Sequence, residues 1–412
     1  MEVKNLLVGQ SGGPSAAINA SLAGVLAEGI ASVRIGKVYG AVNGIVGVLH
    51  GDLVEMNDIA DEKQFQLLKH TPAMALGSCR HKLPQLPEGL SEYQKIEAVF
   101  REYNIGYFFY IGGNDSMDTV DKLSRYFSST DMDVRIIGVP KTIDNDLVET
   151  DHTPGFGSAA RYLAVTVDEI IRDTSIYPTK SVTIMEIMGR DSGWLTLAAA
   201  LPRILGGSKP DIVALPEVPF EENAFLERIR RLFDHTNNVI AVVSEGLRDK
   251  TGSYVGQGAK SGVTDIFGHQ YLSGVGKYLE TVVREQIGCK VRSIEVNLMQ
   301  RCAAHLASQT DLDEAESAGR EAVRRAVAGA TDEMVVFHRI SDQPYKIEIT
   351  GKPVSQIANQ VRTVPPQMRD MNDPVCRENA KRYLLPLIRG CAEQEKDENG
   401  MPRFYLLERH KS

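Results

Sequence analysis

Short apolar runs alternate along most of this chain with longer amphipathic stretches, and this alternation limits the fold more than any other feature. Continuous runs such as GYFFYIG and NVIAVVS are typical of strands buried on both faces in a parallel sheet. The stretches between them repeat apolar residues at helical spacing, as in SEYQKIEAVFREYN. This order of elements predicts an α/β protein whose helices cover the sheet.

The alternation predicts two groups of strands. They comprise residues 5–9, 34–40, 106–112, 134–140, 181–187, 210–217, 238–246, 290–297 and 332–340. At 412 residues the chain is too long for one compact core, so we expect two domains. The boundary is predicted near VPKTIDND, where proline and polar residues follow a strand.

Charge, hydropathy and cysteine usage exclude several classes of protein. A net charge of −8 argues against nucleic-acid binding, and no run approaches the roughly 18 apolar residues of a membrane span. The first residues, MEVKNLLVG, enter a strand pattern at once, which predicts no cleaved signal peptide. Five scattered cysteines without a CxxC pair favour a reduced, cytoplasmic location over a disulfide scaffold or a zinc site.

A glycine turn follows the first predicted strand in VGQSGGPSAAINA. Gly12 and Gly13 end the strand, and Pro14 suits the first turn of a helix because its missing N–H would be unpaired there. Free backbone N–H groups and the positive helix end would then face an anion. A tight turn without a ligand fits equally well, and the pattern is neither GxGxxG nor GxxxxGK[ST].

A second glycine turn, IGGNDS, follows the strand at 106–112. Asn114, Asp115 and Ser116 can cap the next helix, and simple capping is sufficient to explain Asn114 and Ser116. Asp115 needs another explanation, because it puts a negative charge at a site that should attract anions.

Two carboxylates follow the next strand in VPKTIDND. In an extended segment, Asp144 and Asp146 would point to one side. Beside Lys141 they suit a general base, a magnesium site or both, and the alternative is a solvated acidic loop. Their position after a strand favours a site, because α/β proteins bind ligands at the carboxyl ends of strands.

A fourth loop, MEIMGRDSGWL, places Gly189 and Arg190 directly after a strand. A guanidinium group is suited to bidentate binding of a sugar phosphate. Taken alone, a surface ion pair explains Arg190 equally well.

Taken in order, seven stretches of the chain resemble the phosphofructokinase family. They are SGGPSAAINA, LGSCR, GGNDS, PKTIDND, MGRDSGW, VSEGLRD and VRSIEVNLMQR. The resemblance implies two Rossmann-like α/β domains with the active site in the cleft between them. It implies that residues 1–141 plus about 300–350 bind pyrophosphate and Mg²⁺. Residues 142–299 plus about 351–412, with a C-terminal helical extension, would bind fructose 6-phosphate.

Two positions indicate the phosphoryl donor. ATP-dependent members typically read GGDGS and PGTIDND, so Asp115 and Lys141 stand here where those members have glycines, as in the pyrophosphate-dependent branch. The Asp115 carboxylate would fill the space of the ATP α-phosphate and repel it. At about 4 Å and an effective dielectric near 20, the repulsion is on the order of 4 kcal/mol, or about a thousandfold in affinity. Lys141 would add positive charge beside the transferred group.

The resemblance also implies roles for individual residues. Asp144 would be the general base, with Lys141 and Asp115 completing the catalytic set. Pyrophosphate would contact Gly12, Arg80 and Asn114, and Mg²⁺ would bind through Asn114, Asp115 and Asp146. Fructose 6-phosphate would contact Thr142, Asp144, Met188, Gly189, Arg190, Glu245, Arg292, Leu298 and Arg301.

Three positions depart from the family pattern. Asn114 replaces the usual aspartate, and Leu298 replaces the histidine or tyrosine that relatives often carry. Ser181 stands where many relatives place an arginine contributed by a neighbouring subunit, and Lys180 is next to it. A homodimer or homotetramer is expected, because relatives assemble in these forms.

The expected reaction is reversible phosphoryl transfer from pyrophosphate to the C1 hydroxyl of fructose 6-phosphate in glycolysis or gluconeogenesis. An ATP-dependent 6-phosphofructokinase is the nearest alternative, and glycines at positions 115 and 141 would have supported it. A nicotinamide-dependent oxidoreductase would need GxGxxG after the first strand, and this is absent. A regulatory subunit without activity would not require Asp144, Lys141 and Arg190. No role is predicted for the tail after Lys352.

Overall fold

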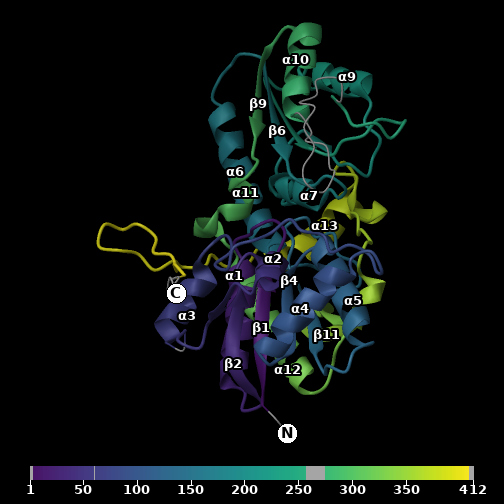
Figure 1. The fold of residues 1–412 in the computed structure, drawn as a ribbon. Coiled ribbons are helices and arrows are strands. Elements are labelled where there is room, and N and C mark those ends of the chain that lie inside the picture. Colours follow the sequence, from purple (N-terminus) through teal and green to yellow (C-terminus); the bar gives the residue numbers. More distant parts are fainter. Residues whose placement is uncertain (1–2, 60, 257–273, 408–412) are drawn as a thin grey trace.

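The computed structural model describes residues 3–59, 61–256 and 274–407, which form two sheets with helices on both faces (Figure 1). The larger sheet has seven strands in the order β11-β10-β5-β4-β1-β2-β3. It is parallel apart from the two edge strands, β3 and β11, which pair antiparallel with their neighbours. Its strands are β1 (Lys4–Gln10), β2 (Ile35–Ala41), β3 (Leu53–Glu55), β4 (Ile105–Gly112), β5 (Arg135–Pro140), β10 (Glu333–Asp342) and β11 (Tyr345–Pro353).

The smaller sheet has four parallel strands in the order β7-β8-β6-β9 and occupies the upper part of Figure 1. Its strands are β6 (Ser181–Ile187), β7 (Ile212–Ala214), β8 (Asn238–Ser244) and β9 (Lys290–Glu295). Every residue of β8 is buried, as expected for a strand with helices on both sides. The prediction of an α/β fold is therefore confirmed.

Helices cover both faces of the seven-stranded sheet. One face packs against α1 (Ile18–Ala31), α3 (Glu62–His70) and α12 (Gln309–Val327). The other packs against α2 (Gly44–His50), α4 (Leu90–Glu102) and α5 (Asn114–Phe127). Helices α1 and α12 touch through their backbones, because a Cβ atom on Gly24 would lie 2.0 Å from the carbonyl oxygen of Glu316. Only glycine allows so close an approach.

The four-stranded sheet lies between two further groups of helices. One face carries α6 (Phe156–Thr174) and α7 (Trp194–Ala199), and the other carries α9 (Glu222–Leu232) and α10 (Val275–Ile287). The short helices α8 (Leu201–Ile204) and α11 (Met299–Cys302) and the 3₁₀ helices η2 (Ala304–Leu306), η3 (Val354–Gln356) and η4 (Pro366–Met368) occur in the connections. No helix in the described ranges is both long and apolar enough to span a bilayer.

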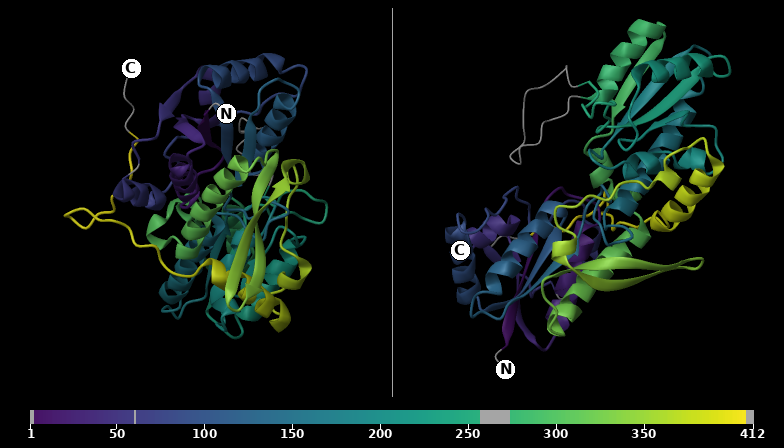
Figure 2. Two further views of the ribbon diagram at one scale, coloured as in Figure 1. Left: turned by 90° about the horizontal axis from the view of Figure 1, so that it is seen from below. Right: turned by 90° about the vertical axis from the view of Figure 1, so that its right-hand side faces the viewer.

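The C-terminal segment contacts both parts of the molecule. Helix α13 (Pro374–Leu387) packs in the same core as α6 and α7. The chain then leaves the body as an extended arm and returns to the neighbourhood of α3 (Figures 1 and 2). There the N–H of Tyr405 donates to Thr71 Oγ1 at 2.8 Å.

A buried charge cluster lies between β10, α12 and the loop that follows β5. His152 is 2% exposed, with Nε2 2.7 Å from Glu314 Oε2 and Nδ1 2.9 Å from Asp151 Oδ2. Its ring stacks on Phe337 with centroids 4.7 Å apart. Burial alone would lower the pKa of His152, but Glu314 and Asp151 outweigh this effect and raise the pKa to about 9.

Candidate active site

Five loops, each at the carboxyl end of a parallel strand, meet at one cavity of about 470 Å³ between the two sheets. They follow β1, β4 and β5 in the larger sheet and β6 and β8 in the smaller one. Strand β1 lies between β4 and β2, where the strand order reverses, which is the usual ligand position in open α/β sheets. Eleven predicted site residues line the cavity: Gly12, Arg80, Asn114, Asp115, Lys141, Thr142, Asp144, Asp146, Met188, Arg190 and Glu245.

Two further predicted residues lie against this lining. The backbone N–H of Gly189 donates to Glu245 Oε1 at 3.2 Å, and Gly189 has a φ of +123°, which favours glycine. Arg301 lies beside the first loop, because its Nη1 is 3.6 Å from the position of a Cβ on Gly13.

The last two predicted residues lie outside the lining. Arg292 is exposed in the middle of β9, an edge strand of the smaller sheet. Leu298 is 54% exposed. Within one chain, the structure therefore does not bring these two side chains into the cavity.

The first loop forms a backbone turn against Lys141. Gly12 has a φ of +78°, and its carbonyl accepts a hydrogen bond from Ser78 Oγ at 2.8 Å. Lys141 is 3% exposed, and its Nζ donates to the carbonyl of Gly13 at 2.5 Å. Pro14 does not start a helix as expected, because α1 begins at Ile18, whose N–H donates to Ser15 Oγ. The loop before the helix is therefore longer than expected, and its Gly12 and Gly13 line the cavity.

The loop that follows β5 differs from the expected extended geometry. Asn145 has a φ of +55°, and the N–H of Asp144 donates to Thr142 Oγ1 at 3.2 Å, so the segment is a turn. The Asn145 side chain fixes this turn by accepting from the N–H of Thr153 at 3.1 Å. Asp144 and Asp146 both line the cavity nevertheless.

Charges in the cavity shift each other's proton affinity. Desolvation raises the pKa of Asp144 to about 8, and Asp146 and Glu245 add to the rise while Lys141 opposes it. Burial lowers the pKa of Lys141 to about 8, against the attraction of Asp144 and Asp146. A carboxylate whose pKa is near the working pH suits a general base.

The N-terminus of α5 is arranged differently from the sequence expectation. Helix α5 begins at Asn114 after Gly113, and no side chain caps it, so Asn114 and Asp115 lie in its first turn. Asp115 Oδ1 is 3.1 Å from Lys82 Nζ, and both side chains are about half-exposed. The carboxylate that was expected to repel ATP is therefore partly compensated by a cation.

The side of the cavity that the smaller sheet forms holds a buried donor. Arg190 Nε is buried and has no hydrogen-bond partner among the residues that the structure describes. Burial raises the pKa of Glu245, whereas Arg190 lowers it. A phosphate oxygen would satisfy the guanidinium, because buried donors are normally hydrogen-bonded.

Six lining residues are absent from the predicted set, and three of them, Gly13, Gly113 and Ser116, directly adjoin predicted residues. Asp191 lines the cavity and pairs with Arg248 Nη2 at 2.9 Å, and its position directly after Arg190 in MGRD could have indicated it. Asn359 and Val361 come from the C-terminal tail, where no motif points to the site.

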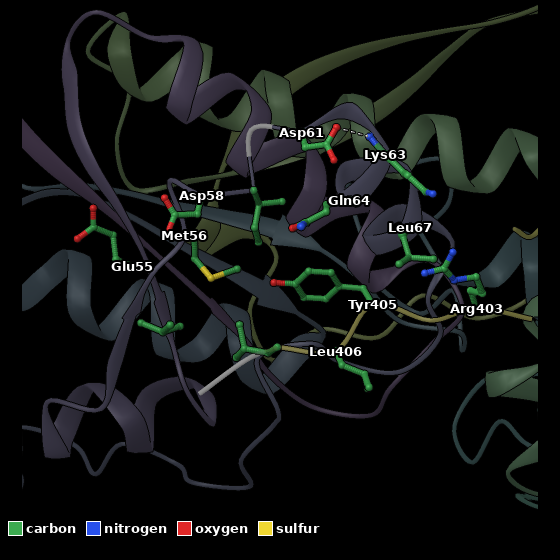
Figure 3. A pocket seen from close by; sticks show the side chains of 13 residues that line it. Glu55, Met56, Asp58, Asp61, Lys63, Gln64, Leu67, Arg403, Tyr405 and Leu406 are labelled. Carbon is green, nitrogen blue, oxygen red and sulfur yellow. Dashed lines mark hydrogen bonds between the residues drawn. The ribbon is translucent and has the colours of Figure 1, made fainter. Parts of the chain in front are cut away.

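A second cavity, of about 490 Å³, lies between β3, α3 and the C-terminal arm (Figure 3). Tyr405 and Arg403 of the arm face Lys63 and Leu67 of α3 there. None of the predicted site residues, all of which are described, lines this cavity. This second cavity is therefore separate from the cavity at which the five loops meet.

The donor atoms in the main cavity fit a hard cation. No cluster of three or more His, Cys, Asp or Glu side chains suited to a metal occurs in the part of the chain that the structure describes. Mg²⁺ does not need one, because it is usually held by one or two carboxylates, water and substrate phosphates. The mutual repulsion of Asp144, Asp146, Glu245 and Asp191 shows that positive charge would be favourable here.

The fold and this cavity together define an α/β phosphotransferase, in which backbone and cations face an anion beside a carboxylate that can accept a proton. The chain belongs to the phosphofructokinase family, because the family model "Phosphofructokinase" matches residues 5–325.

Full-length relatives agree with this assignment. A pyrophosphate–fructose 6-phosphate 1-phosphotransferase of Xanthomonas campestris pv. campestris is 40% identical over 405 residues, covering 98% of this chain and 96% of the relative. One of Halomonas elongata is 39% identical and covers 100% and 98%. The crystal structure of the pyrophosphate-dependent phosphofructokinase of Nitrosospira multiformis matches with a TM-score of 0.85 at 33% identity, covering 98% and 96%. The predicted resemblance to the pyrophosphate-dependent branch is confirmed.

Proposed function

We propose that this chain transfers a phosphoryl group reversibly from pyrophosphate to the C1 hydroxyl of fructose 6-phosphate. The products are fructose 1,6-bisphosphate and phosphate. One observation carries the proposal. Lys141 and Asp144, which follow β5 of the larger sheet, line the same cavity as Arg190 and Glu245, which follow strands of the smaller sheet. The full-length relatives carry the name of this activity.

In the proposed mechanism, Asp144 is the general base. The C1 oxygen attacks one phosphorus of pyrophosphate, the bond from that phosphorus to the bridging oxygen breaks, and phosphate leaves. The hydroxyl proton passes to Asp144, whose raised pKa suits it for this step. Lys141 Nζ and the N–H groups of the Gly12–Gly13 turn stabilise the negative charge on the phosphates. The Lys141 ammonium group is already held at the carbonyl of Gly13, so the site needs little reorganisation during the reaction.

Magnesium binding is part of the proposal. Asp146 is the best candidate among the predicted ligands, because Asn114 and Asp115 are already engaged by neighbouring residues. The ion would neutralise charge on the pyrophosphate oxygens, with water completing its coordination. Burial raises the pKa of Asp146, and a nearby cation would favour its ionised form.

The sugar phosphate would bind on the side of the smaller sheet. Arg190 has an unsatisfied buried Nε, and Arg301 lies next to the first loop. Gly189 and Met188 hold the backbone of this side in place through hydrogen bonds to Glu245 and Gln300. We also propose a homodimer or homotetramer, in which the exposed Arg292 of one subunit can serve a neighbouring cavity.

The proposed domains follow the two sheets. Residues 1–141 with about 300–350 would bind the donor, which is supported by the pairing of β10 with β5. Residues 142–299 with about 351–412 would bind the sugar phosphate. The packing of α13 on α6 and α7 supports this, whereas Val354 and Ile357 pack in the same core as α5 of the other part.

The test is a coupled assay of fructose 1,6-bisphosphate formation with pyrophosphate and ATP as alternative donors at equal free Mg²⁺. We expect turnover with pyrophosphate and at least a hundredfold lower kcat/KM with ATP. Faster turnover with ATP would overturn the donor assignment, and no product with either donor would overturn the activity.

A further inference from the structure

Part of the C-terminal tail borders the donor side of the active-site cavity. Asn359 and Val361 line the cavity together with Asn114 and Asp115. Asn359 and Val361 are exposed and Asp115 is half-exposed, whereas Lys141 is 3% exposed. The tail residues therefore lie at the mouth of the cavity, and Lys141 lies at its floor.

The carboxamide of Asn114 holds the tail in this place. Its Nδ2 donates to the carbonyl of Gln360 at 2.5 Å, and its Oδ1 accepts from the N–H of Asn359 at 2.6 Å. Asn359 Nδ2 donates to Asp118 Oδ1, one turn further along α5, at 3.1 Å. A carboxylate only accepts hydrogen bonds, so aspartate at position 114 would face the Gln360 carbonyl without a donor.

The other end of the segment is fixed to the catalytic loop. The N–H of Arg362 donates to the carbonyl of Asp146 at 2.7 Å. The Arg362 guanidinium lies over the Trp194 ring at 4.7 Å, and Trp194 Nε1 donates to the Arg362 carbonyl at 3.3 Å. The segment thus spans from the first turn of α5 to the loop that carries the proposed base.

We propose that residues 359–361 form a fixed wall at the mouth of the donor site, and that this wall limits the length of the polyphosphate that binds productively. Asn114 is a positioning residue that holds the wall, instead of a magnesium ligand. The inference rests on the proposed function, because a donor whose transferred group lies at Lys141 must extend towards this mouth. We expect two phosphoryl groups to fit between Lys141 and the wall, and a third to meet the apolar Val361 and the Asp115 carboxylate, which both line the cavity.

The test compares pyrophosphate with linear tripolyphosphate, using Asn114→Asp, Val361→Gly and a control. Asn114→Asp removes the donor to Gln360 at nearly constant volume, and Val361→Gly widens the mouth without removing a hydrogen bond. Asn379→Asp is the matched control, because Asn379 Nδ2 also donates to a backbone carbonyl, that of Gln367, but on α13 away from the cavity.

For Asn114→Asp and Val361→Gly, we expect the competitive inhibition constant of tripolyphosphate against pyrophosphate to fall about tenfold. The KM of pyrophosphate should rise several-fold in Asn114→Asp, and the KM of fructose 6-phosphate should not change. Trp194 is the only tryptophan of the chain, so release of the segment in Asn114→Asp should also change the emission spectrum. The control should match the wild type in all four measurements.

Other outcomes would overturn the inference. If Asn114 were a magnesium ligand, Asn114→Asp would lower the Mg²⁺ concentration needed for half-maximal activity and leave tripolyphosphate inhibition and Trp194 emission unchanged. Unchanged inhibition in Val361→Gly would contradict the wall even if Asn114→Asp did not fold. A wild type that is inactive with pyrophosphate would instead refute the proposed function.

Discussion

Donor selection at position 115 can be separated into a contribution of charge and a contribution of size. Asp115→Asn removes the charge and keeps the volume, whereas Asp115→Gly removes both. Lys82→Met removes the cation that lies 3.1 Å from the Asp115 carboxylate. The three variants therefore distinguish electrostatic repulsion of ATP from steric exclusion.

The structure gives a smaller repulsion than the sequence alone suggested. For two unit charges about 4 Å apart, the energy is about 4 kcal/mol at an effective dielectric of 20 and about 1 kcal/mol in bulk water. Asp115 is about half-exposed and paired with Lys82, so the lower part of this range applies. A repulsion of about 1–2 kcal/mol corresponds to about 5- to 30-fold in ATP affinity.

The assay is competitive inhibition of the pyrophosphate reaction by ATP at constant free Mg²⁺ and low ionic strength. In Asp115→Asn we expect the inhibition constant to fall about 5- to 30-fold, and the difference from wild type should shrink in high salt. Lys82→Met should raise the constant, because it leaves the carboxylate uncompensated. If Asp115→Gly lowers the constant and Asp115→Asn does not, ATP is excluded by volume and the electrostatic reasoning is wrong.

Three further predictions concern catalysis and stability. Asp144→Asn should lower kcat at least about a hundredfold with little change in the KM of fructose 6-phosphate. The control Glu149→Gln, in the same loop, should be active. A kcat near wild type in Asp144→Asn would exclude Asp144 as the base. Gly24→Ala would place its Cβ 2.0 Å from the Glu316 carbonyl, so the free energy of unfolding in urea should fall by about 1–3 kcal/mol or more, and an unchanged value would contradict the close helix contact. The pKa of His152 is about 9 in the folded protein and 6.5 when unfolded, so protonation of His152 stabilises the folded state. This contribution to stability is complete below pH 6.5 and is lost as the pH rises through 9. The stability lost over this pH range is about 3 kcal/mol. In His152→Gln, the urea midpoint should therefore vary less over the same range than in wild type.

The loops of the active site could be predicted because their signals are local. Each follows an apolar run that can only be a buried strand, and the carboxyl ends of parallel strands meet at the same edge of a sheet. Gly12, Asn114, Lys141 and Arg190 were therefore expected to lie together, and all four line one cavity. Strand β11 gave no such signal, because none of the residues of this antiparallel edge strand is buried.

The remaining features depend on contacts between distant segments. Asn114 was recognised as a departure from the family pattern, but its partners lie about 245 residues away in a segment without a motif. Lys82 follows Arg80 by two residues, yet its pairing with Asp115 exists only after the loop folds over α5. Local periodicity and residue preference carry no information about such pairs.

The tail also explains how two nearby carboxylates are held in a partly desolvated cavity. Arg362 donates to the carbonyl of Asn145 at 2.9 Å and to that of Thr150 at 3.0 Å, and Asn145 Nδ2 donates to the Tyr383 hydroxyl at 2.7 Å. These bonds fix the left-handed turn between Asp144 and Asp146. Because desolvation opposes the ionisation of both carboxylates, the loop would relax towards solvent unless its backbone were anchored. The segment to which no function could be assigned from sequence thus supports the geometry of the proposed base.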